Sequence, residues 1–226
     1  MQYEVVTADA VSWLASQRDM SVDLILLDYA YESLEKHRKR GTTTRLKKSK
    51  SSDNAWFEIF PNYRLAELLH ELYRVLRPDR HAYLFCDGET SDVLRPIVAA
   101  MPRGAAFTWW KRLIWDKGRR GMGYHYGYRH EFIVFLEKGK RTLREPNMDD
   151  ILRCPLIRGG YPGEKPVQLL KTLIEQSTRP REVIVDPFCG SGSTGVAALE
   201  LGRRFRGCDI AASAVELAET RLAAVR

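Results

Sequence analysis

The sequence predicts an α/β fold with a mostly parallel, twisted sheet and helices on both faces. Apolar runs without polar alternation, at 22–27 and 183–185, are typical of strands buried on both sides in a parallel sheet. Amphipathic helical segments alternate with such runs along the chain, as in strand–helix–strand units. Because the chain has 226 residues and 44% of them are hydrophobic, we expect a single domain over 1–226.

Periodicity and breaker residues assign most of the chain to strands and helices. Strands are expected at Tyr3–Val6, Val22–Leu27, His81–Cys86, Phe107–Trp115, Phe132–Leu136, Val183–Val185 and Arg204–Ile210. Helices are expected at Ala10–Ser16, Asn62–Leu76, Thr90–Ala100, Pro166–Thr178, from Gly195 to Leu201 and at Ala211–Ala224. Pro78 should stop the second helix, because proline cannot continue a helical ladder. Segment 141–160 has little periodicity and is expected to be a loop.

A glycine-rich turn follows the 183–185 run and leads into a helix. Gly190 and Gly192 allow a sharp turn and a close approach of the backbone to a ligand. A strand, such a turn and a helix N-terminus together predict a nucleotide-type cofactor site. The glycines also fit the dinucleotide pattern, so a nicotinamide or flavin site is an alternative. Too little chain follows for a second dinucleotide half, which disfavours that alternative.

A second candidate site lies where the 22–27 run ends, at Asp28-Tyr29-Ala30-Tyr31. The carboxyl ends of strands carry ligand sites in open α/β sheets. An acid followed by two aromatic residues at such an end can supply a carboxylate and a stacking ring. The alternative is an acid that only caps a loop.

Two loops suit a nucleic-acid partner, and the net charge of +7 agrees with one. Segment 36–52 is rich in Lys and Arg and has no acid, so it should contact phosphates. Segment 117–130 mixes aromatic, basic and glycine residues, a composition that can stack on unpaired bases. The residues expected to contact nucleic acid are Lys36, Arg38, Arg40, Lys47, Lys48, Arg119, Arg120, Tyr124 and Tyr126. A solvated basic run and tyrosines packed on the domain are the alternatives.

Other features disfavour several classes of protein. The four cysteines are too far apart for a metal knuckle, so no metal is expected, and isolated thiols fit a reducing cytoplasm. The start of the chain has no signal-peptide pattern, and no run of eighteen apolar residues predicts a membrane span.

The word Asp186-Pro187-Phe188-Cys189-Gly190-Ser191-Gly192 closely resembles the S-adenosylmethionine motif of DNA amino-methyltransferases. The Asp28–Tyr31 word is similar to that family's catalytic Asp-Pro-Pro-Tyr, and here it precedes the cofactor word, as in the circularly permuted (beta) class. The Lys165–Pro166 pair and Asp9 match two further family positions. The resemblance implies a Rossmann-like methyltransferase fold. Both prolines of the catalytic word are replaced, so a looser turn is expected.

The resemblance also implies roles for individual residues. Asp28, the backbone carbonyl of Tyr29 and the ring of Tyr31 would act on the target base. The implied S-adenosylmethionine site comprises Asp9, Ala10, Asp28, Lys165, Asp186, Phe188, Gly190, Ser191, Gly192, Thr194 and Asp209. Within it Asp209 would accept from the ribose, Phe188 and Asp9 would contact the adenine, and Lys165 would pair with the methionine carboxylate.

The predicted function is therefore methyl transfer from S-adenosylmethionine to the exocyclic amine of a flipped base in double-stranded DNA, with N6 of adenine favoured. The DNA-contacting loops are expected at 32–58, 116–130 and 140–161. N4 of cytosine is an alternative, and a DNA-binding relative with weak catalysis is an alternative from another class. Cytosine-C5 methylation is disfavoured, because no Pro-Cys word supplies its thiolate. The resemblance is also compatible with a homodimer.

Overall fold

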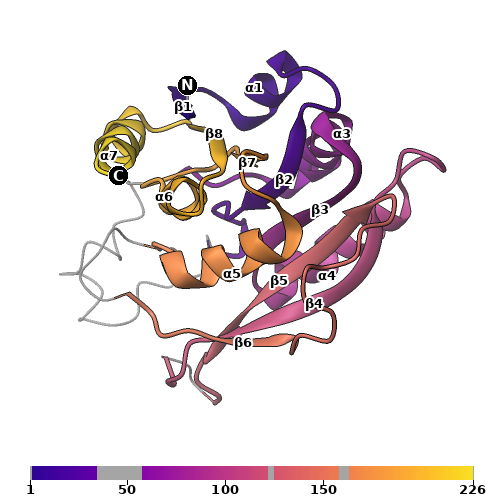
Figure 1. The fold of residues 1–226 in the computed structure, drawn as a ribbon. Coiled ribbons are helices and arrows are strands. Elements are labelled where there is room, and N and C mark those ends of the chain that lie inside the picture. The colour runs from indigo at the N-terminus through magenta and orange to yellow at the C-terminus, as the bar shows by residue number, and fades with distance from the viewer. Residues whose placement is uncertain (1, 35–57, 122–124, 158–162, 226) are drawn as a thin grey trace.

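The computed structural model describes residues 2–34, 58–121, 125–157 and 163–225. Within these ranges, eight strands form one sheet, in the order β1-β8-β7-β2-β3-β5-β4-β6 (Figure 1). The strands are β1 Tyr3–Thr7, β2 Val22–Leu27, β3 Leu76–Cys86, β4 Thr108–Asp116, β5 His130–Lys138, β6 Ile151–Arg153, β7 Val183–Asp186 and β8 Arg204–Asp209. Strands β1, β8, β7, β2 and β3 are parallel, whereas β5 is antiparallel to both β3 and β4.

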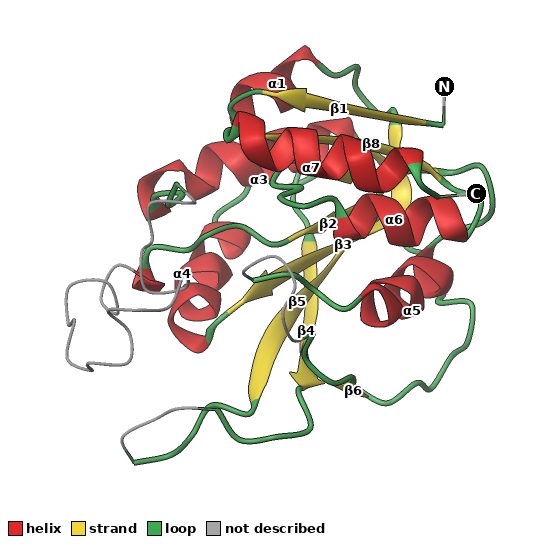
Figure 2. Cartoon of the chain, turned by 90° about the vertical axis from the view of Figure 1, so that its left-hand side faces the viewer, coloured by secondary structure: helices red, strands yellow, loops and turns green. Residues whose placement is uncertain are grey.

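Helices cover both faces of this sheet, as Figure 2 shows from the side. They are α1 Ala10–Ser16, α3 Leu65–Val75, α4 Gly88–Ala99, α5 Val167–Ser177, α6 Ser193–Glu200 and α7 Ala212–Ala223, with a short 3-10 turn at Asn62–Arg64. One buried cluster joins the sheet to α1, α3 and α4, and a second joins it to α5, α6 and α7. The predicted fold class is confirmed. No helix among the described residues is long and apolar enough to cross a membrane.

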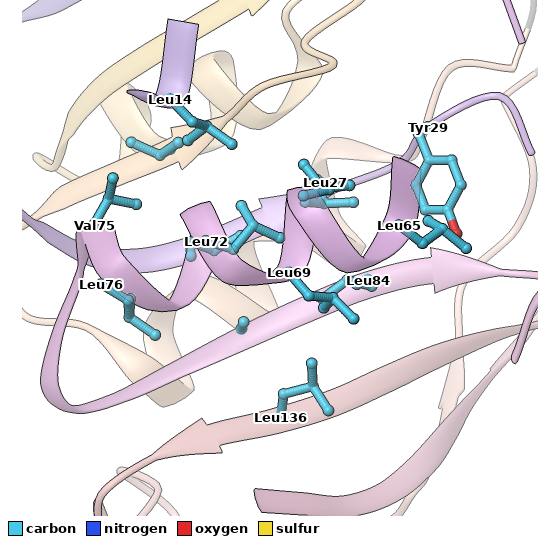
Figure 3. Close-up of a cluster of buried hydrophobic side chains, with 14 of the residues drawn as sticks. Leu14, Leu27, Tyr29, Leu65, Leu69, Leu72, Val75, Leu76, Leu84 and Leu136 are labelled. Carbon is cyan, nitrogen blue, oxygen red and sulfur yellow. The ribbon is translucent and has the colours of Figure 1, made fainter. Parts of the chain in front are cut away.

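Strand β2 lies at the centre and is buried on both faces. Ile25 and Leu27 belong to the cluster under α3, whereas Leu24 and Leu26 belong to the opposite cluster. Figure 3 shows the first of these clusters, in which α3 packs its leucines against the sheet. The absence of polar alternation in the sequence thus reflects burial on both sides.

The start of β3 differs from the prediction of His81, whereas the predicted end of α3 agrees within one residue. The helix ends at Val75, and Leu76 already begins β3, which contains Pro78. The register of β3 against β2 shifts between Leu76 and His81, so the intervening residues form an irregularity. Proline has no N–H to donate to the ladder, and it is tolerated at such an irregularity because the regular pairing of β3 with β2 is interrupted there. The predicted loop at 141–160 also contains the short strand β6, and α6 begins at Ser193 rather than at Gly195.

A buried carboxylate fixes the amino end of the β2–β7 pair. Asp23 is 1% exposed and accepts hydrogen bonds from the backbone N–H of Val183 (2.9 Å) and from the guanidinium groups of Arg77 (2.7 Å) and Arg80 (3.2 Å). These bonds join β2 to β7 and β3. Strand β2 runs from there toward the opposite edge of the sheet, where the candidate site lies.

Candidate active site at the carboxyl edge of the sheet

The carboxyl ends of β1, β2, β7 and β8 surround a pocket of about 400 Å³. The sheet order sets β7 between β8 and β2, so the two motif-bearing turns meet although they are far apart in sequence. The pocket is lined by all the residues predicted to bind the cofactor or the target base except Gly192, namely Asp9, Ala10, Asp28, Tyr29, Tyr31, Lys165, Asp186, Phe188, Gly190, Ser191, Thr194 and Asp209.

The turn after β2 is anchored without prolines. The Ala30 carbonyl accepts a hydrogen bond from the Phe60 N–H at 2.8 Å, and Tyr31 forms a parallel bridge with Phe60. The Tyr29 ring is 1% exposed and lies 5.6 Å from the ring centre of Phe188 and 5.9 Å from that of Phe60. In Figure 3 the Tyr29 hydroxyl lies beside the Leu65 side chain. Backbone pairing and aromatic packing therefore hold this turn where the resemblance suggested a looser one.

The glycine-rich turn after β7 is held by two carboxylates. Asp186 is buried, and its two oxygens accept from the Phe188 N–H at 3.0 Å and the Thr194 hydroxyl at 2.7 Å. Asp209, at the end of β8, accepts from the N–H groups of Gly190 and Ala211, both at 2.9 Å. The Asp186 carboxylate therefore shapes its own turn, and Asp209 remains half-buried at the pocket wall.

Gly192 occupies a backbone conformation that favours glycine. It has a φ of 80° and lies at the N-cap of α6. A Cβ added there would lie 2.9 Å from the Cβ of Ala218 on α7. Gly195 is confined by packing instead, because its Cβ would lie 2.7 Å from side-chain atoms of Leu222 and Phe205. The absence of a side chain at Gly192 and Gly195 thus allows α6 to pack closely against α7 and β8.

Two predicted site residues already have partners within the protein. Asp9 caps α1 by accepting from the Ser12 N–H at 3.0 Å, and it pairs with Arg64 at 2.7 Å. The Arg64 hydrogen bond holds the pKa of the Asp9 carboxyl well below its usual range. Lys165 donates to the Asp28 carboxylate and lies 3.5 Å from Glu131. The resemblance pairs Lys165 with the methionine carboxylate of the cofactor, whereas in the structure Lys165 contacts the Asp28 carboxylate.

Sequence reasoning missed several pocket residues. Arg64 and Phe60 reach the pocket from the segment before α3, and Glu131 reaches it from the start of β5. Glu164 pairs with Arg221 of α7 at 2.6 Å, and the same guanidinium donates to the Ser191 carbonyl at 2.9 Å. An acid beside an apolar strand was the one sequence signal for Glu131. Nothing in the local pattern marks Arg221, because its role depends on where α7 packs.

The hairpin between β4 and β5 projects from the same edge of the sheet. The N–H of Gly121 donates to the Tyr128 carbonyl at 2.6 Å, so backbone pairing continues beyond the strands. Tyr126 is 93% exposed, and Arg119 and Arg120 are also exposed. The predicted contacts Lys36, Arg38, Arg40, Lys47, Lys48 and Tyr124 lie outside the described residues.

Comparison with known proteins gives a consistent family. A family model described as DNA methylase, of N6/N4 methyltransferases, matches residues 22–155 and 147–220. YubD of Escherichia coli (strain K12), a methylase by name, is 36% identical over 158 residues, covering 70% of this chain and 68% of that protein. Across the curated relatives, the matches span 40% to 68% of the relatives' own lengths.

Solved structures share the fold. The crystal structure of the M1.HpyAVI-SAM complex has a TM-score of 0.70 at 20% identity, covering 97% of this chain and 98% of that one. The cytosine-N4-specific PvuII DNA methyltransferase also has a TM-score of 0.70, at 12% identity, covering 98% of this chain and 86% of that one.

The buried Asp186 carboxyl generates a prediction about pH. Burial raises its pKa from 3.8 to about 7, so the folded protein holds this proton where the unfolded chain has lost it. Stability should therefore fall as the pH rises from about 4 to about 7. Relative to Asp186→Asn, wild type should lose about 3 kcal/mol of unfolding free energy between about pH 5 and about pH 8. Urea titrations measure this, and parallel losses in the two proteins would contradict it.

Proposed function

This chain belongs to the N6/N4 DNA methylase family, and from that premise we propose that it transfers a methyl group from S-adenosylmethionine to N6 of adenine in double-stranded DNA. The observation that carries the proposal is the meeting of the Asp28 turn and the glycine-rich turn in one pocket. The choice of adenine rests on the aspartate of the catalytic word, which by resemblance is commoner in adenine enzymes.

The pocket residues fit S-adenosylmethionine chemically. The half-buried Asp209 carboxylate is an acceptor suited to ribose hydroxyls, and the Phe188 ring offers an apolar face for adenine. Asp9 remains ionised and can accept from an exocyclic amino group. The bare backbone at Gly190 lets the methionine portion approach closely. When bound, this cofactor supplies an electrophilic methyl group on a sulfonium sulfur.

The Asp28 carboxylate accepts a hydrogen bond from the target amine in this proposal. The lone pair of an exocyclic amine is delocalised into the base, so the amine is a weak nucleophile. A carboxylate that accepts its N–H favours the pyramidal nitrogen and stabilises the positive charge that develops there. The base must leave the duplex to reach Asp28, and the half-buried Tyr31 ring beside it can stack on the base.

Asp28→Ala should abolish methyl transfer, lowering turnover at least about a hundredfold, the cost of losing one transition-state partner. Affinity for S-adenosylmethionine should stay within about tenfold, because the glycine-rich turn is intact. The measurement is incorporation of radioactive methyl into DNA, followed by digestion and mass spectrometry of the nucleosides.

The matched control is Asp19→Ala, which removes an exposed acid before β2, at the opposite edge of the sheet. Wild type should yield N6-methyladenine. N4-methylcytosine would move the target to the second amine, the chemistry named for the PvuII enzyme. A wild-type protein that binds DNA and cofactor without incorporation would support the weakly catalytic alternative, and unchanged turnover in Asp28→Ala would remove the role of Asp28.

The β4–β5 hairpin should contribute to DNA binding through two kinds of side chain. Each Arg that neutralises a phosphate releases counterions, so replacing Arg119 and Arg120 with Ala should flatten the slope of log K against log salt by up to about 2 units. Tyr126→Ala should instead lower affinity for DNA with an unpaired target base by ~1–3 kcal/mol through lost stacking and leave the slope unchanged.

Arg179 and Arg181 form the control pair, because they lie before β7 at the far edge of the sheet and are exposed. Their double Ala variant loses the same charge and should keep the wild-type slope. Fluorescence anisotropy across a salt series measures all three variants. Equal slopes for the two Arg double variants would place the phosphate contacts elsewhere.

A further inference from the structure

A chain of alternating charges runs along the pocket wall from Asp28. Lys165 donates to the Asp28 carboxylate and lies 3.5 Å from Oε2 of Glu131, and Lys117 donates to Oε1 of Glu131 at 2.5 Å. These four residues come from the end of β2, the segment before α5, the start of β5 and the segment just after β4. The fold therefore assembles this chain of charges from parts of the sequence that are far apart.

This chain of charges is sheltered from water. The side chains of Lys165 and Glu131 are 11% and 19% exposed. The Lys165 ammonium lies 5.3 Å from the ring centre of Phe85 and 5.9 Å from that of Trp115, a cation–π arrangement. Within the described part of the chain, Oε2 of Glu131 is buried without a hydrogen-bond partner. Such a site makes each charge depend strongly on its neighbours.

Burial raises the pKa of the Asp28 carboxyl, and the nearby Glu131 charge raises it further, whereas Lys165 and Lys117 lower it. Asp186, at the end of β7, is a further acid that interacts with Asp28. A protonated Asp28 would carry a hydrogen where the target amine must donate one. Lys165 is thus the main group that opposes protonation of Asp28.

We propose that Lys165 and Glu131 are positioning residues for Asp28, an inference that rests on the proposed function. The Lys165 ammonium holds one oxygen of the Asp28 carboxylate, so that the other oxygen is aimed at the target amine. Glu131, anchored by Lys117, holds the ammonium in that place. The rival role for Lys165 is to bind the methionine carboxylate of the cofactor.

Lys165→Met keeps the length of the side chain and removes its charge. We expect kcat to fall at least tenfold, since small displacements of a catalytic group cost up to about a hundredfold. The acid limb of the kcat–pH profile should move to higher pH, because Asp28 loses the cation that lowers its pKa. The Kd for S-adenosylmethionine should change less than about threefold, as expected for a loss confined to the transition state. Lys165→Arg should recover part of kcat.

Glu131→Gln is the complementary variant. It removes a negative charge from beside Asp28, so the acid limb should move to lower pH, opposite to Lys165→Met. Its kcat should also fall, because the ammonium is less firmly held. The control is Lys171→Met on α5, which breaks an ion pair with Glu200 of α6 outside the pocket and should match wild type.

Titration of the Asp28 carboxyl by 13C NMR tests the inference without requiring activity. We expect the Asp28 pKa to be higher in Lys165→Met and lower in Glu131→Gln than in wild type. An Asp28 pKa that is unchanged in Lys165→Met would overturn the inference. A wild-type kcat–pH profile in that variant, with cofactor affinity weakened tenfold or more, would also overturn it and assign Lys165 to the cofactor. If both pKa shifts occur but wild-type protein methylates no DNA, the proposed function is wrong, and the inference that Lys165 and Glu131 control Asp28 is retained.

Discussion

The parallel pairing of β2 with β7 is the constraint on which the site depends. Leu24 and Ile25 pair with Ile184 and Val185, which joins segments about 160 positions apart in the chain. Both strands are buried on both faces, so a slip of one residue would exchange the side chains of the two core clusters. The Asp23 carboxylate secures the far end of this pair through the Val183 N–H. With the register fixed, the turns after the two strands are brought to the same pocket.

Two acids lie at the carboxyl ends of these paired strands, Asp186 as the last residue of β7 and Asp28 just after β2, and their partners give them different roles. Burial raises the pKa of both the Asp28 and the Asp186 carboxyl. The hydrogen-bond donors to Asp186 among the described residues are a hydroxyl and a backbone N–H, which suit an acid that shapes a turn. Asp28 meets the Lys165 ammonium, which favours the ionised form needed to accept an N–H. Neighbouring acids with different environments are a recurring way to divide chemical tasks within one site.

Much of the fold and the site outline could be predicted from the chain because local patterns encode them. Apolar runs marked β2 and β7, and the Asp186–Gly192 word marked the glycine-rich turn. Long-range packing determines the rest. The Lys165–Glu131 contact needs β5 to lie beside β3, and no local pattern specifies that neighbour. The start of β3 was predicted too late in the chain because Pro78 lies at an irregularity within β3 rather than between the helix and the strand.

The central claim is that the Asp28 turn and the glycine-rich turn form a single cofactor and target-base site. A crystal structure of the wild-type protein with sinefungin, a nonreactive analogue of S-adenosylmethionine, tests this claim most directly. We expect the analogue to lie in the pocket between β2 and β7, contacting Asp28 on one side and Gly190 and Asp209 on the other. An analogue bound outside this pocket, or bound to the glycine-rich turn with Asp28 turned away from it, would contradict the account.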